Sequence, residues 1–150
     1  MARRWALLSA TVVVLVGGSA AFGYPPAAPK GTHLVQASLS EPFDISTAGS
    51  TDLHFEHVIF PPGASSGWHS HGGPTLGAVK SGTLTVYRAS PGGCTASEYA
   101  AGQGLFEPAN EVLMARNNGP EPVEIYVNHI VVPGVDVTTP AEKPAGDCPA

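Results

Sequence analysis

The sequence contains few charged residues, and its net charge is negative. Asp, Glu, Lys and Arg make up only 13% of the 150 residues, and 7 basic residues against 12 acidic ones give a formal charge of −5. A chain without a basic excess has little with which to neutralise phosphates, so we expect no nucleic-acid partner. The length suits one domain with its own hydrophobic core.

The chain also lacks a helical pattern. No window between Lys30 and Pro133 shows an apolar stripe of helical period, and 18 glycines with 15 prolines are too many for a helical bundle. Short apolar segments between turn residues instead predict strands, and strands so spaced form a sandwich or a closed barrel. The predicted strands cover residues 33–39, 52–60, 76–79, 83–87, 105–106, 112–116 and 123–132.

Cysteine is scarce, with only Cys94 and Cys148 in the chain. No C-x-x-C spacing is present, so a thiol redox or metal site is the less favoured interpretation. In an exported chain the pair predicts a disulfide, which would tie the Pro-rich tail at residues 136–150 to the rest of the domain. Because the disulfide would close a loop of more than fifty residues, loop-closure entropy predicts a stabilisation of about 4 kcal/mol.

The N-terminal segment has the order of a secretory signal. Two arginines precede an apolar run at residues 5–16, and small residues follow up to residue 23. This order predicts a signal helix over residues 1–23, followed by a Pro-rich linker over residues 24–31. The apolar run is shorter than the roughly 20 residues of a membrane span, which disfavours the alternative of an uncleaved anchor. We therefore expect an exported protein with no stable span after cleavage, by either the general or the twin-arginine route.

The sharpest chemical feature is the segment Trp68-His69-Ser70-His71. Residues two apart in a strand point to the same face, so His69 and His71 can converge on one metal ion. Imidazole nitrogens suit Fe, Mn, Ni, Cu or Zn. A pair of histidines alone is weak support for a site, because such pairs are common on surfaces.

The setting of the pair resembles the two sequence motifs of the cupin superfamily. The first motif is matched by Gly63, His69, His71 and Gly82, and the second by Gly102, Pro108 and Asn117. The resemblance implies an all-β fold, a single double-stranded antiparallel barrel of jelly-roll type, over residues 32–135. It also implies that any metal lies near one mouth of the barrel, and that two copies can pair through their sheets.

Two departures from the cupin pattern weaken the metal site. The resemblance implies three histidines and one glutamate as ligands, but Thr75 occupies the glutamate position and Leu113 the second-motif histidine position. A further motif glycine is replaced by Asn110. Only His69 and His71 remain of the family's ligand set, and two imidazoles alone do not make a selective site.

Other side chains could repair the site, though each has a simpler structural role. Glu111 lies two residues before Leu113 and could bring a carboxylate to the barrel mouth. His57 is expected to face inward together with Leu53, Phe55 and Ile59, since these alternate residues form the more apolar face of their segment. His129 could face either way. The predicted ligand pocket is lined by Thr75, Leu113, Phe106 and Tyr126.

Three functions follow from this sequence. The favoured one is an exported cupin that binds a small molecule in its barrel, with a degenerate two-histidine metal site. The second is a metal-dependent dioxygenase or isomerase in which Glu111 or another histidine completes the ligand set. The third is a non-catalytic structural module of the cell envelope. Fold alone does not separate them, because one fold supports many functions.

Overall fold

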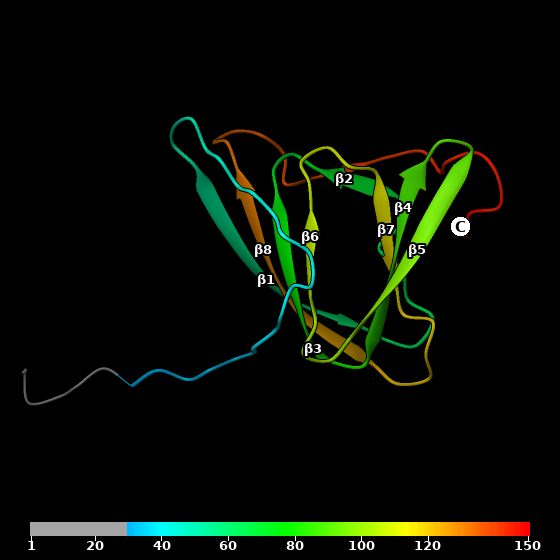
Figure 1. Ribbon diagram of the computed structural model, residues 1–150, viewed down its shortest axis with the longest axis horizontal. Helices are drawn as coiled ribbons and strands as arrows, with labels where there is room; N and C mark the ends of the chain where they lie inside the picture. The colour runs from blue at the N-terminus through cyan, green and yellow to red at the C-terminus, as the bar shows by residue number, and fades with distance from the viewer. Residues whose placement is uncertain (1–29) are drawn as a thin grey trace, which may run out of the picture. The chain divides into compact units, whose positions relative to one another are not determined.

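The strands form two antiparallel sheets that face each other (Figure 1), which confirms the predicted all-β cupin-type barrel. The computed structural model describes residues 30–150, so the predicted signal helix at residues 1–23 lies outside the described residues. The nine strands are β1 (Asp52–Phe60), β2 (His69–His71), β3 (Thr75–Ser81), β4 (Thr83–Ser90), β5 (Gly93–Ala100), β6 (Gly104–Glu107), β7 (Leu113–Arg116), β8 (Val123–Val131) and β9 (Thr138–Pro140). In this part of the chain there is no helix with the length and hydropathy of a membrane span.

One sheet has four strands in the order β1-β8-β3-β6, and the other has five in the order β5-β4-β7-β2-β9. The main core lies between them and consists of alternate strand residues, as a two-layer β fold requires. It contains Val79, Leu84, Val86, Leu105, Leu113, Ala115, Val123 and Ile125. This core fills one end of the barrel and leaves the end nearest β2 lined by polar side chains.

Three expectations about strands were wrong. Residues 33–39 form no strand; only Ser38 bridges Gln103. The strand β5 was missed because its sequence is mostly small and polar, with no apolar alternation to mark a buried face. The strand β9 was missed because it lies in the Pro-rich tail, where proline argues against a sheet interior; β9 is an edge strand, where proline is tolerated.

The orientation of β1 is also opposite to the prediction. Leu53, Phe55 and Ile59 are 57%, 77% and 57% exposed, so their face of the strand points to solvent. Val58 and Phe60 pack against the core instead. Both faces of this strand carry apolar residues, so the pattern alone could not decide which one faces inward.

The motif residues that do not carry chemistry shape the chain around the site. Gly82 has a φ of +76°, and a Cβ there would lie 2.8 Å from the Pro122 carbonyl oxygen. Asn110, which replaces a motif glycine, also has a positive φ of 63°, a conformation that asparagine tolerates better than most residues. The fully buried Asn117 donates hydrogen bonds to the carbonyls of Phe60 and Glu121. These three residues therefore have structural roles in the backbone and need no bound ligand to account for them.

Candidate metal and ligand site in the barrel

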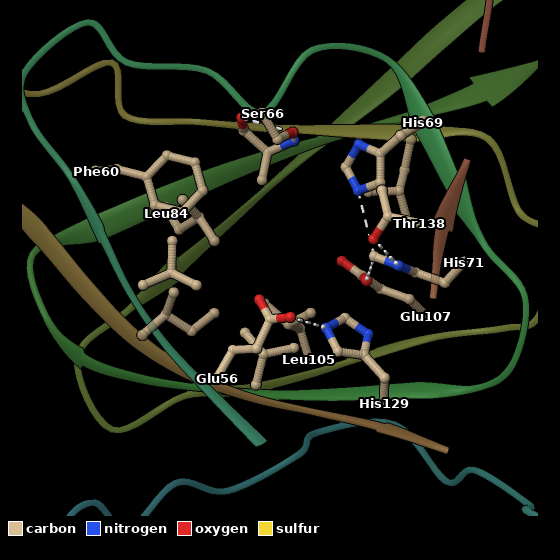
Figure 2. Close-up of a pocket in the computed structure, with 15 residues that line it drawn as sticks. Glu56, Phe60, Ser66, His69, His71, Leu84, Leu105, Glu107, His129 and Thr138 are labelled. Carbon is tan, nitrogen blue, oxygen red and sulfur yellow. Dashed lines mark hydrogen bonds and ion pairs between the residues drawn. The ribbon is translucent and has the colours of Figure 1, made fainter. Parts of the chain in front are cut away.

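A cavity of about 200 Å³ opens between the two sheets next to β2. Its floor is apolar and is formed by core residues such as Leu84 and Leu113. Figure 2 shows the rings of His69, His71 and His129 and the carboxylates of Glu56 and Glu107 around this cavity. The cavity thus combines an apolar end with a cluster of groups that can bind a metal or a polar ligand, as small-molecule sites commonly do.

The two histidines of the H-x-H segment are held by β2 and its neighbours. His69 pairs with Leu113 of β7, and the whole of β2 pairs with β9 in the tail. Both imidazoles are buried. Their common direction follows from strand alternation, as the sequence predicted.

The hydrogen-bond partners of these two rings determine which ring nitrogen can bind a metal ion or accept a hydrogen bond. His69 Nδ1 lies 2.9 Å from the Gly67 carbonyl oxygen, and His71 Nδ1 lies 3.0 Å from the Val137 carbonyl oxygen. A carbonyl can only accept, so in the neutral rings each Nδ1 carries the hydrogen and each Nε2 presents a lone pair. The two Nε2 atoms are 3.2 Å apart. They cannot bond each other while both rings are neutral.

A buried carboxylate adds a third acceptor to this pair. Glu107 Oε2 lies 3.3 Å from His71 Nε2, and Glu107 is only 5% exposed. Three buried hydrogen-bond acceptors in a row destabilise the fold unless a proton or a cation lies among them. Sequence reasoning missed Glu107, although its spacing of two from the core residue Leu105 was a signal that it faces inward.

The strand pairing of Thr75 brings Glu107 and His129 to the site. Thr75, which occupies the cupin glutamate position, is the direct cross-strand partner of Glu107 on β6. On its other side Thr75 pairs with His129 on β8. Opposed residues of antiparallel strands have their side chains on the same face. A carboxylate and an imidazole therefore flank Thr75 on the inner face of the four-stranded sheet.

Thr75 itself orients His129. Its Oγ1 lies 2.8 Å from His129 Nδ1, and both side chains are buried. The ring of His129 lies against that of His71, with centroids 4.5 Å apart, and its Nε2 is 4.0 Å from Glu56 Oε1. His129 therefore faces the cavity, and Thr75 supports it from behind without lining the cavity itself.

Burial and the neighbouring charges shift the pKa values of the three histidines in different directions. Burial lowers the pKa of His69 and of His129. Burial also acts to lower the pKa of His71, but the nearby Glu107 carboxylate and the Val137 carbonyl outweigh it, and the pKa of His71 is raised. Of the three rings, His71 is the one that most readily holds a proton beside Glu107.

The donor spacing fits a metal ion. Two ligand atoms bound to one ion at about 2.0–2.1 Å lie roughly 2.8–3.4 Å apart for angles between octahedral and tetrahedral values. The distances of 3.2 Å between the two Nε2 atoms and 3.3 Å from His71 to Glu107 fall within that range. His71 lies close to each of the other two groups, but within residues 30–150 no group of three or more His, Cys, Asp or Glu side chains is placed so that it could hold a metal ion. Binding of an ion would draw His69 and Glu107 together.

The remaining predicted site residues lie in several places. Leu113 lines the cavity, as expected. Glu111 is ion-paired with Arg88 at 3.2 Å outside the cavity, and His57 lies 2.8 Å from Glu124 on the outer face of β1. Neither therefore joins His69 and His71.

The two aromatic residues of the predicted pocket also lie elsewhere. Phe106 stacks on Phe43 with ring centroids 5.3 Å apart, and Tyr126 stacks on His57 at 4.6 Å. Neither lines the cavity. Their strands alternate, so the inward positions belong to Leu105 and Ile125 instead.

The tail contributes more than the predicted attachment. Cys94 and Cys148 form the expected disulfide. Thr138 of β9 lines the cavity, and its Oγ1 is 3.2 Å from His71 Nδ1. Farther along, the indole of Trp68 donates to the Pro149 carbonyl at 3.0 Å. The tail therefore forms part of the same wall of the site as β2.

The sequence pattern of the cupin domain matches residues 56–132, just over half of the chain. The chain belongs to the cupin family. No curated protein sequence is similar enough to count as a match.

Among solved structures, the chain resembles oxalate decarboxylase from Bacillus subtilis, with 24% identity and a TM-score of 0.47 over 51% of this cupin and 21% of that enzyme. It also resembles a structure of DMSP lyases, with 23% identity and a TM-score of 0.49 over 60% of this chain and 44% of the other. The chain thus matches about a fifth of the first protein and less than half of the second. Likenesses at this level concern the fold and leave activity open.

Proposed function

We propose that this cupin binds a divalent transition-metal ion, iron(II) in the first place, beside a pocket for a small molecule. The ligands are His69 Nε2, His71 Nε2 and the carboxylate of Glu107. The observation that carries the proposal is the row of three buried acceptors, 3.2 and 3.3 Å apart, with no protein donor described between them. A bound cation would satisfy all three at once.

Two imidazoles and one carboxylate are the ligand set of many non-haem iron(II) oxygenases, and they leave coordination positions open. The bound ion would supply Lewis-acid or oxygen-activating chemistry there. The residues of this chain orient the imidazoles through the Gly67 and Val137 carbonyls and offer the substrate an apolar floor. These features support a metal-dependent enzyme rather than a purely structural module.

A metal-free ligand pocket is the second candidate, and one observation favours it. The raised pKa of His71 allows its Nε2 to carry a proton and donate to Glu107, which would satisfy two of the three groups without an ion and leave only His69 Nε2 without a donor. In that case the polar end of the cavity would bind the small molecule through hydrogen bonds alone.

Export remains part of the proposal. The disulfide between Cys94 and Cys148 supports it, because structural disulfides persist mainly in oxidising compartments outside the cytosol. The signal-like order of the N-terminal residues gives independent support.

The metal content of the purified protein tests the proposal. The protein would be reconstituted with Fe(II), Mn(II), Ni(II), Cu(II) and Zn(II) salts in turn, desalted, and analysed by elemental mass spectrometry. We expect one ion per chain, lost in the variant with both His69→Ala and His71→Ala. His57→Ala is the matched control and should keep the ion, because His57 lies on the outer face. If no salt gives stoichiometric metal, the metal-free pocket replaces the proposed centre.

A further inference from the structure

The cavity is lined by two carboxylates but by no lysine or arginine. Glu56 and Glu107 line it, and none of its described lining residues is Lys or Arg. Glu107 faces His71, so its charge has a partner in the proton or ion proposed above. Glu56 is left as a second carboxylate inside the same cavity, and its charge has no comparable partner.

The placement of Glu56 suits contact with a ligand. Its carboxylate is directed into the cavity in Figure 2, and its nearest polar contact is His129 Nε2 at 4.0 Å, longer than a hydrogen bond. Its side chain is still 53% exposed, so it lies where a ligand would enter rather than in a finished interaction. The negative charge of Glu56 also acts on His71 and His129, which places it within electrostatic reach of these two rings.

The neighbours of Glu56 do not neutralise it. His129 Nε2 lies 4.0 Å from the Glu56 carboxylate, which is too far for a hydrogen bond. Across β1 and β8, Glu56 pairs with Val127, which also lines the cavity and carries no charge. An anionic group of a ligand would be repelled at this end of the cavity, while a positive group would find an unmatched carboxylate.

We propose that the cavity selects a small molecule with a positively charged ammonium-type group, which contacts Glu56, and an oxygen donor at its other end. The oxygen end would bind the ion on His69, His71 and Glu107, and for that end the inference rests on the proposed function. The cavity of about 200 Å³ holds the volume of roughly six or seven water molecules at about 30 Å³ each. The cavity therefore suits a compact zwitterion or amine rather than an anionic nucleotide or dicarboxylate.

A pair of probes that differ only in charge tests this inference. Trimethylglycine carries a carboxylate and a quaternary ammonium, and tert-butylacetate has the same shape with a neutral carbon in place of the nitrogen. Both would be titrated by calorimetry, at up to millimolar concentrations, into the full chain reconstituted with Mn(II), and the metal content of each sample would be measured separately. We expect trimethylglycine to bind about tenfold more tightly than tert-butylacetate, which lacks the positive charge, because tenfold is the effect of one well-placed charge pair.

Variants assign the preference to one residue. Glu56→Gln should abolish the discrimination while leaving the metal content unchanged, and Glu111→Gln, which alters a carboxylate outside the cavity, should keep it. The inference is overturned if neither probe binds to protein that holds Mn(II), if tert-butylacetate binds as well as trimethylglycine, or if Glu56→Gln still discriminates. If the protein takes up no Mn(II), the metal centre fails and the carboxylate end of the probes has no ion to bind. The contact with Glu56 is then tested on the metal-free protein with tetramethylammonium, which has no carboxylate and whose binding Glu56→Gln should abolish.

Discussion

The two walls of the cavity are built in different ways. The wall that carries His69 and His71 is the three-residue strand β2, which shares one residue pair with β7 and is otherwise paired with β9 of the tail. The opposite wall carries Glu107 and His129 on β6 and β8, which pair with β3 in the middle of the other sheet. The first wall depends on a distant segment fixed by a disulfide, and the second is supported by continuous strand pairing.

This difference predicts that the wall carrying His69 and His71, here called the histidine wall, is the easier one to disrupt. A variant with both Cys94→Ser and Cys148→Ser should lose about 4 kcal/mol of unfolding free energy, because the disulfide closes a loop with a sequence separation of 54. It should also bind metal more weakly, since the tail supplies the Val137 carbonyl that orients His71. Chemical denaturation and metal titration measure the two effects. A variant of full stability would show that strand pairing alone holds β9.

The other wall should respond to the loss of a single hydrogen bond. Thr75→Val keeps the shape of the side chain but removes the hydroxyl that contacts His129 Nδ1 in a fully buried position. Leaving a buried polar group unsatisfied costs about 1–3 kcal/mol. Urea denaturation of the metal-free variant measures the cost, with Thr83→Val at an exposed strand position as control. Equal stabilities of the variant and the natural protein would mean that Thr75 does not hold His129.

A smaller effect, the pH dependence of stability, distinguishes His71 on one wall from His129 on the other. The folded-state pKa of His71 is raised above its ordinary value of 6.5, so its proton stabilises the metal-free fold fully below that value and stops doing so as the pH rises through the raised pKa. The pKa of His129 is lowered, so its titration acts in the opposite direction and costs stability as the pH falls below 6.5. We expect the stability difference between the natural protein and His71→Gln to shrink between about pH 5 and about pH 8. A difference that grows over this range would contradict the raised pKa.

The same contrast explains how much the sequence could reveal. The histidine wall was predictable, because an H-x-H spacing places two rings on one face of a strand whatever the rest of the fold does. Leu113 lines the cavity, and its role in binding a ligand stays a prediction. The barrel itself followed from the strand pattern and the motif spacings.

The wall that carries Glu107 was predictable only in part. The spacing of Glu107 from Leu105 indicated that it faces inward, but the side chains that it meets depend on which strands lie side by side. Glu107 became a candidate only once β6 was seen to pair with β3, which brings it opposite Thr75. Glu111 was favoured in its place because it lies close in sequence to Leu113, but Arg88 holds it outside the cavity. The inward face of β1 was misassigned because both of its faces carry apolar residues, and this hid Glu56.

The role of Glu107 is tested most directly by comparing two conservative variants that each remove one negative charge. Glu107→Gln and Glu111→Gln would be reconstituted with Fe(II) under argon, and the affinity for the ion would be measured by competition with a chelator. We predict that Glu107→Gln loses about 100-fold or more in affinity, the scale expected when a ligand rather than a supporting group is removed, while Glu111→Gln binds as the natural protein does. Equal affinities in the two variants would contradict the assignment of Glu107 as the third ligand.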